Sequence, residues 1–137
     1  MNTKSITFTV LGTPRPQGSL KAFMVKGKPQ LTSDNPKMRP WRQEVGWEAL
    51  RAWGSGALLA PRDVPVTVKI VFYLRRAKSA LKRDIRPTKK PDLDKLARSV
   101  LDSLKGVLYY DDSQVCVLDV SKDYGLPERA VITVEAL

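Results

Sequence analysis

The stretch VPVTVKIVFYL, residues 64–74, decides the fold of this chain. Every second residue in it is apolar, as expected of a strand that packs one face against a core. These residues are Val66, Val68, Ile70, Phe72 and Leu74. Val71 and Tyr73 add apolar surface to the opposite face. Because strands that are apolar on both faces lie inside a sheet, we expect residues 64–74 to form a central strand.

Further strand signals flank this stretch on both sides. Residues 5–10 (SITFTV) alternate and are rich in β-branched side chains, and residues 114–122 and 130–137 have a similar character. The Gly/Pro-rich segment GTPRPQGS interrupts regular structure after the first strand. Residues 21–33 then suggest a hairpin that turns at residues 26–28.

Two stretches have apolar residues at helical spacing. Residues 39–53 place Trp41, Val45, Ala49 and Ala52 on one face, and Pro40 suits the first turn of a helix. The second helix follows Pro91, and Gly106 ends it in the manner of a C-cap. Its recurring apolar residues are Leu93, Leu96, Ala97, Val100, Leu101 and Leu104.

The order of these elements predicts the fold class. A chain of 137 residues is long enough for one domain with its own core. We therefore expect a single compact α/β (α+β) domain over residues 1–137, in which two main helices pack on a mixed β-sheet. The element order favours this layered arrangement rather than βαβ winding.

The composition limits the chemistry. The chain has 24 Lys and Arg against 14 Asp and Glu, a formal net charge of +10, which favours nucleic acid as partner over a merely basic surface. It has no His and one Cys, so catalysis by His and a Cys-rich zinc site are excluded. No apolar run reaches the roughly 18 residues of a membrane span, and the N-terminus lacks the apolar stretch of a signal peptide. We expect a cytoplasmic protein that does not enter a membrane.

Positive charge is concentrated between residues 75 and 90. A solvated loop can carry such a run, but its confinement between two expected elements favours contact with phosphates. The basic residues of this segment are Arg75, Arg76, Lys78, Lys82, Arg83, Arg86, Lys89 and Lys90. Arg15 and Lys21 are further candidates for DNA contact.

Two aspartates interrupt this basic region in KKPDLDK, residues 89–95. Asp92 and Asp94 would diverge on a helix but face the same way in an extended approach to one, where a divalent cation can neutralise them. The alternative is that one of them caps the following helix. A second pair, Asp111 and Asp112, suits a turn. A short return after a helix of about 16 Å would bring the pairs together as a Mg²⁺ site for phosphoryl transfer.

The stretch KPDLDKLARSVLDSLKGVLYYDDSQVCVLDVSKDY resembles the core signature of the RusA family of Holliday-junction resolvases. That family has D-L-D at the start of a helix and an aspartate pair followed by S/A-Q-V. The segments GTPRPQGSLKAF and PWR (residues 40–42) also resemble phage and prophage members, so the likeness covers most of the chain.

The resemblance implies a homodimeric, Mg²⁺-dependent endonuclease, with Mn²⁺ able to substitute and no small-molecule cofactor. It would bind four-way branched DNA and cut two opposed strands by symmetric nicks that leave 5′-phosphates. Asp92, Asp94 and Asp112 match the metal-binding catalytic aspartates, and Arg98 stands where the family has a functional lysine. Arginine keeps the charge but cannot shuttle a proton.

The resemblance also implies supporting roles beside the metal ligands. Lys95 stands where many relatives have Asn, and Asp111 is placed to support the metal site from outside its ligand set. A non-catalytic branched-DNA-binding module of the same fold remains the alternative function, and an RNA or single-strand nuclease would share the chemistry.

Three apolar or aromatic positions complete the expectations. Trp47 is a candidate for the dimer interface, with ordinary partial burial the favoured reading. Cys116 is expected to be a small buried residue in a strand. Tyr109 and Tyr110 are expected to pack, with stacking of one on a base as the alternative.

Overall fold

The computed structural model describes residues 4–17, 20–25, 28–33 and 38–137, and for residues 20–25, 28–33, 38 and 39 it describes the backbone alone. The elements lie in the order β1 (Lys4–Leu11), β2 (Leu20–Val25), β3 (Lys28–Ser33), α1 (Met38–Trp53), β4 (Val66–Leu74), α2 (Leu93–Leu104), the short 3₁₀ helix η1 (Asp112–Gln114), β5 (Val115–Tyr124) and β6 (Arg129–Ala136). The helices and strands expected from the sequence are all present, with ends that differ by at most two residues.

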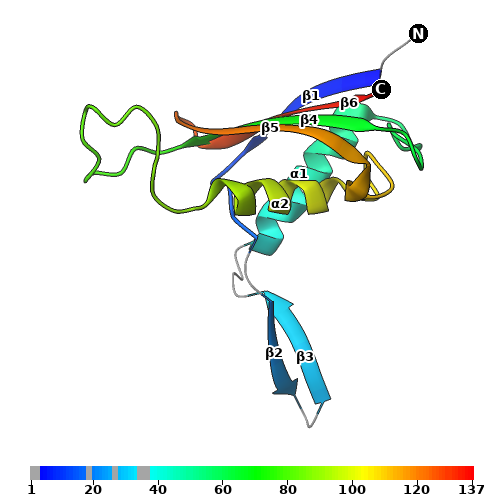
Figure 1. Ribbon diagram of the computed structural model, residues 1–137, viewed down its shortest axis with the longest axis horizontal. Helices are drawn as coiled ribbons and strands as arrows, with labels where there is room; N and C mark the ends of the chain where they lie inside the picture. The colour runs from blue at the N-terminus through cyan, green and yellow to red at the C-terminus, as the bar shows by residue number, and fades with distance from the viewer. Residues whose placement is uncertain (1–3, 18–19, 26–27, 34–37) are drawn as a thin grey trace.

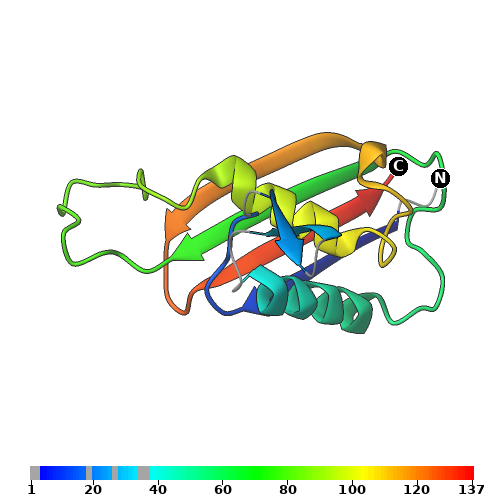
Figure 2. The same cartoon turned by 90° about the horizontal axis from the view of Figure 1, so that it is seen from below.

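The main sheet has four strands in the order β1-β6-β4-β5. Strand β4 lies inside it, antiparallel to β6 and parallel to β5, which confirms the central position expected of residues 64–74. Both helices lie on the same face of the sheet (Figure 1), and the view from that side shows α1 near β1 and α2 near β5 (Figure 2). The expected mixed sheet with two helices on it is therefore confirmed, in one α+β domain.

One local arrangement differs from the expectation. Because β4 and β5 are parallel, the segment β4-α2-β5 is a βαβ unit, although the sequence order favoured a fold without one. Parallel neighbours need a crossover, and α2 supplies it. The hairpin expected at residues 21–33 is present as β2 and β3, which pair antiparallel as a separate sheet and project from the domain (Figure 1). Its turn residues 26 and 27 lie outside the described part of the chain.

The core lies between the helices and the covered face of the sheet. Trp41, Val45 and Ala49 of α1 are buried there, as the helical spacing predicted, whereas Ala52 is exposed. Strand β4 contributes the apolar face predicted for it, and Leu96, Val100 and Leu104 contribute from α2. Full burial of each such side chain stabilises the fold by about 1.5–3 kcal/mol relative to exposure. This apolar contact fixes α2 against the sheet. It therefore also sets which side chains of α2 lie on the sides that do not face the core.

Two expectations about burial are wrong. Trp47 is 63% exposed on the outer side of α1, where Leu50 is 45% exposed one turn further on. Cys116 is exposed with its neighbours on the edge strand β5, and the pairing of β4 with β5 shifts register beside it, between Val66 and Thr67. Val66 pairs with Val115 and Thr67 with Val117, so Cys116 is the unpaired residue of a bulge on an edge strand.

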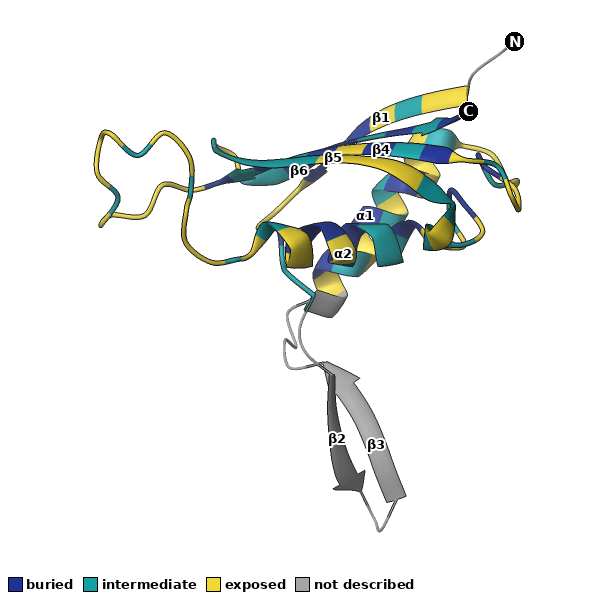
Figure 3. Cartoon of the chain, in the orientation of Figure 1, coloured by how far each residue is buried: buried dark blue, intermediate teal, exposed yellow. Residues whose placement is uncertain are grey.

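Figure 3 shows where the chain is most exposed. The basic segment 75–90 forms a long loop that extends beyond the end of β4, and most of its residues are exposed. No helix in the described part of the chain is long and apolar enough to cross a membrane.

Candidate active site

The start of α2 positions the first two aspartates. Asp92 is the N-cap residue, with φ −69° and ψ 137°, so the chain enters the helix in the extended conformation that the sequence suggested. Its carboxylate makes no capping hydrogen bond to the helix, and its ion-pair partner is Lys95 at 3.9 Å. Asp94 lies in the first turn. Both carboxylates are exposed, so both are free to meet a cation or be screened by solvent.

Asp94 faces a groove between α2 and β5. The groove has a volume of about 540 Å³ and is also lined by Arg98, Asp112, Leu118 and Val120. Arg98 follows Asp94 by four residues, and residues at this spacing lie on the same side of a helix. The structure thus brings three of the predicted site residues, Asp94, Arg98 and Asp112, to one surface.

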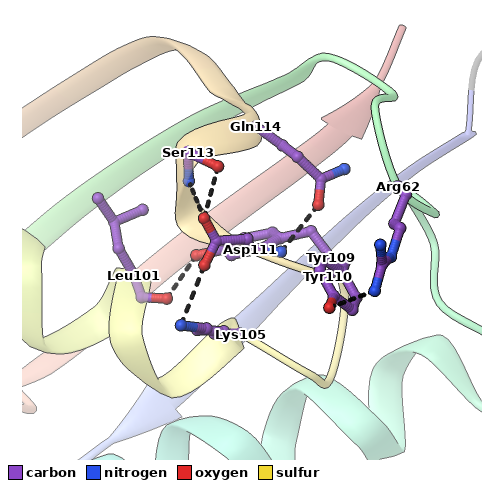
Figure 4. A network of polar contacts seen from close by, with 8 residues as sticks. All are labelled: Arg62, Leu101, Lys105, Tyr109, Tyr110, Asp111, Ser113 and Gln114. Carbon is purple, nitrogen blue, oxygen red and sulfur yellow. Dashed lines mark hydrogen bonds and ion pairs between the residues drawn. The ribbon is translucent and has the colours of Figure 1, made fainter.

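Asp112 is held beside the C-terminal half of α2 rather than at its start. The N–H groups of Val107 and Leu108 donate to the Leu104 carbonyl at 3.0 and 2.9 Å, and the buried Tyr109 hydroxyl donates to the Leu101 carbonyl (Figure 4). The return to β5 is therefore bonded to the last turns of the helix, starting at Gly106, whose φ of 77° lets the chain reverse.

The short return explains a difference from the expected site. The sequence suggested that the return would bring Asp112 back to Asp92 and Asp94. In the described residues, no three acidic, Cys or His side chains are gathered closely enough to hold a metal ion. Asp94 and Asp112 share the groove instead of forming a closed cage.

Asp111 organises the turn before β5. Its carboxylate accepts hydrogen bonds from the N–H and hydroxyl of Ser113, and the Gln114 side chain accepts from its N–H at 2.8 Å, which makes a capping box for η1. Lys105 pairs with it at 3.0 Å (Figure 4). These bonds, with that of the Ser113 hydroxyl first, lower the pKa of Asp111 to about 2. The turn expected at Asp111 is present, and its carboxylate is already engaged within it.

A further carboxylate, Asp102, was missed by sequence reasoning. Burial raises its pKa, Asp112 raises it further, and Arg42, Arg98 and Lys105 act in the opposite direction. Asp102 thus lies close enough to charged side chains of α1, of α2 and of the turn at Asp112 for each to affect its pKa. The signal was present in the spacing, since residues 94, 98 and 102 follow one stripe of α2.

The two tyrosines of the return have different surroundings. Tyr109 is fully buried, which confirms that it packs, and burial first and the nearby aspartates second raise its pKa. Tyr110 is 47% exposed, with the Arg62 guanidinium 4.0 Å from its ring centroid and donating to its hydroxyl. Arg62 therefore occupies one side of the ring on which a base was considered able to stack.

The basic loop is attached to the end of β5. Arg76 stacks at 4.1 Å from the ring centroid of Tyr124, and Arg86 pairs with Asp123 at 3.3 Å. Both side chains remain exposed to solvent, but they also anchor the loop. The other exposed cations of the loop make no ion pair or side-chain hydrogen bond with the described residues: Arg75, Lys78, Lys82, Arg83, Lys89 and Lys90.

Of the two DNA-contact candidates near the N-terminus, Arg15 and Lys21, the structure describes the side chain of Arg15 alone. Arg15 lines a cavity of about 420 Å³ beneath the loop, together with Arg75, Lys89 and Lys90. The structure thus brings Arg15 to the basic loop from far away in the sequence. Lys21 lies in β2, and its side chain is outside the described part of the structure.

The two carboxylates that share the groove, Asp94 and Asp112, suit a hard divalent cation held by few protein ligands. Asp92, Asp94 and Asp112 offer carboxylate oxygens, and Mg²⁺ is commonly held by one or two carboxylates with water and substrate phosphate completing its shell. The Asp92 carboxylate, which the helix leaves uncapped, is available for this purpose. The groove that carries Asp94 and Asp112 thus lies on the helix that follows the basic loop.

Comparison with known proteins defines the class further. The sequence matches the family described as Endodeoxyribonuclease RusA over residues 11–135. It is also similar to the uncharacterized protein YqaN of Bacillus subtilis (strain 168), with 32% identity over 135 residues that cover 94% of each chain. The chain belongs to the RusA family of endodeoxyribonucleases, which confirms the resemblance found in the sequence.

The Asp111 turn makes a prediction about stability. Replacing Asp111→Ala removes a cap and an ion pair, and we expect the Tm at pH 7, in chelator, to fall by roughly 3–5 °C. Because the folded-state pKa of Asp111, about 2, lies below its ordinary value of 3.8, its stabilisation is present above pH 4 and lost as the pH falls toward 2. Thermal unfolding should therefore show the variant and the wild type converging in acid. The control Asp119→Ala, on an exposed residue of β5, should not reproduce this pattern.

Proposed function

We propose that this protein is a Mg²⁺-dependent, structure-selective endodeoxyribonuclease that resolves four-way DNA junctions. It would make paired symmetric nicks that leave 5′-phosphates. The observation that carries the proposal is the groove that joins Asp94, Arg98 and Asp112 beside a basic loop, in a chain of an endodeoxyribonuclease family.

The proposed metal ligands are Asp92, Asp94 and Asp112, with Mn²⁺ able to replace Mg²⁺. The bound ion would supply Lewis-acid activation of the phosphodiester and of the attacking water. Arg98 binds the scissile phosphate through its planar fork of N–H donors and keeps its charge at every working pH. Lys95, which pairs with Asp92, limits repulsion at the helix start, and Asp111 holds the turn that presents Asp112.

DNA contact is assigned to the basic loop and its base. The loop cations that pair with no other described residue bind phosphates, with Arg15 and Lys21 adding contacts from the first part of the chain. Arg76 and Arg86 have a double role, since they also tie the loop to β5. The position of the loop next to the start of α2 directs a bound strand toward the carboxylates.

The proposed protein is a homodimer. Two equal nicks on a junction with approximate two-fold symmetry need two active sites related by the same symmetry. Trp47 and Leu50, exposed one turn apart on α1, support an apolar contact between two copies.

The alternative is a branched-DNA-binding module without catalysis. Such a module would gain affinity by losing the carboxylates next to its basic loop, whereas a nuclease needs them. Incubation with a synthetic four-way junction and a matching linear duplex, each with Mg²⁺ or chelator, separates the two. Binding without cutting when Mg²⁺ is present would refute the nuclease.

We expect Asp94→Asn to abolish nicking while the junction is bound as tightly or more tightly. Loss of partners outside the ligand set costs 10–100-fold in many metal enzymes, so loss of a ligand should cost about 100-fold or more. The measurement is single-turnover cleavage at saturating protein, beside a gel-shift titration in chelator. The matched control is Asp119→Asn on the exposed β5 edge. Loss of binding by Asp94→Asn would assign Asp94 a structural role.

The phosphate contacts predict a steep salt dependence of binding. Replacing Lys78, Lys82 and Arg83 by Ala should weaken junction binding and lower the slope of log K against log salt by about 2.7, since each contact contributes about 0.9. A triple variant at Lys4, Arg51 and Lys69 removes the same charge elsewhere and should change the slope less. Equal effects of the two variants would mean that the field is diffuse and the loop has no special contact.

The dimer makes a separate prediction. Sedimentation equilibrium should give twice the monomer mass, and Trp47→Asp should shift the mass to the monomer and replace paired cuts by single nicks. Leu126→Asp alters another exposed apolar residue, 64% exposed, and should leave the mass unchanged. A monomeric wild type that still makes paired cuts would contradict the symmetry argument.

A further inference from the structure

Lys122 makes a contact that the proposed chemistry does not use. It is half-buried in β5, and its ammonium donates to the main-chain carbonyls of Lys89 at 3.0 Å and Pro91 at 2.9 Å. Both carbonyls belong to the last three residues before Asp92. One cation therefore holds two alternate peptide groups of the segment that leads into α2.

The hydrogen bonds of Lys122 stand in place of the capping hydrogen bond that Asp92 does not make. An Asp at an N-cap normally fixes the helix start by accepting a hydrogen bond from a backbone N–H of the first turn. Asp92 makes no such bond, and the first helical bond there runs from the Leu96 N–H to the Asp92 carbonyl at 3.0 Å. The carboxylate of Asp92 is left uncapped, and the entering backbone is fixed by Lys122 instead.

A second contact holds the same turn from the opposite part of the chain. The Gln17 N–H donates to the Lys95 carbonyl at 2.8 Å. The segment that leads into α2 is thus tied to β5 through Lys122, and the first turn of α2 is tied to the segment after β1 through Gln17. The next two residues of β5 contact the basic loop further from the aspartates, Asp123 at Arg86 and Tyr124 at Arg76. Of these three residues of β5, Lys122 is therefore the one whose contacts lie next to Asp92.

We propose that Lys122 is a positioning residue for the carboxylates at the start of α2. Its two hydrogen bonds fix residues 89–91, and through them the direction in which Asp92 and Asp94 present their oxygens to a cation. This inference rests on the proposed function for its catalytic consequence, but not for its structural content. Lys122 does not itself touch the reacting phosphate.

The test compares Lys122→Met, which keeps the chain length and loses the donors, with Lys122→Arg, which keeps a cation and donors. Amide hydrogen exchange is measured on the metal-free protein. We expect residues 96–98 to exchange about 10-fold faster in Lys122→Met, because a loosened helix start opens locally more often. Lys122→Arg should stay within about 3-fold of the wild type. Lys69→Met, an exposed lysine on the other face of the sheet, is the matched control and should change nothing.

The catalytic consequence is a split between cutting and binding. Lys122→Met should nick a bound junction about 10–100-fold more slowly and need more Mg²⁺ for half-maximal rate, with the junction Kd within about 3-fold of the wild type. Unchanged exchange at residues 96–98, or an equal change in Lys69→Met, would overturn the proposal. So would a salt slope reduced by about 0.9 with cutting of bound junction intact, since Lys122 would then be a phosphate contact.

Failure of the proposed function is distinguishable from failure of this inference. If the wild type does not cut junctions, exchange at residues 96–98 still tests whether Lys122 fixes the helix start. Broadening of the amide signals of residues 92–96 by Mn²⁺, in protein without DNA, then tests whether that start binds a cation. Mn²⁺ should broaden these signals at lower concentration in the wild type than in Lys122→Met. Equal concentrations would overturn the positioning role.

Discussion

The parallel pairing of β4 with β5 is the constraint on which the site depends. Two parallel neighbours cannot be joined by a hairpin, so the chain must leave the end of β4, cross the face of the sheet and enter β5 from the other end. The basic loop, α2 and the Asp111 turn are the three parts of this crossover. Because Leu96, Val100 and Leu104 must face the core, Asp94 and Arg98 fall on the side of α2 that borders β5. The groove is a geometrical consequence of burying the helix.

The crossover also explains how opposite charges coexist in so basic a chain. The loop cations project beyond the sheet, where solvent and salt screen them, whereas the carboxylates lie along α2 and its return. Each region has its own ion pair, since Arg86 of the loop pairs with Asp123 of β5, and Lys95 pairs with Asp92 at the start of α2. In the proposed function, a strand of DNA drawn to the loop would meet the aspartates where the loop ends. The separation of charge along the crossover would then orient the bound strand.

The sequence predicted what depends on local periodicity and missed what depends on register. The apolar faces of β4 and α2 repeat at periods of 2 and 3.6, so both elements and their buried sides followed from the residues. The place of Asp112 did not, because it depends on hydrogen bonds from residues 107–109 back to the end of α2. Cys116 was misassigned because its strand lies at the edge of the sheet, a position that is set only by the order in which the strands pair. Trp47 was misassigned because it lies at the border of the apolar face of α1, where a large aromatic side chain can turn toward the core or toward solvent.

The arginine at position 98 follows from the same geometry. A groove that carries Asp94 and Asp112, with Asp102 beside the latter, accumulates negative charge before any cation or DNA arrives. A lysine there would offset this charge only while protonated, and a buried or paired lysine readily changes its pKa. Arginine remains charged, and Arg98 lies one turn from Asp94 and one turn from Asp102 along one stripe of α2. Its permanent charge has a chemical cost, since Arg98 cannot deliver a proton to the leaving oxygen. In the proposed reaction, Arg98 would therefore hold phosphate and balance charge rather than donate the proton.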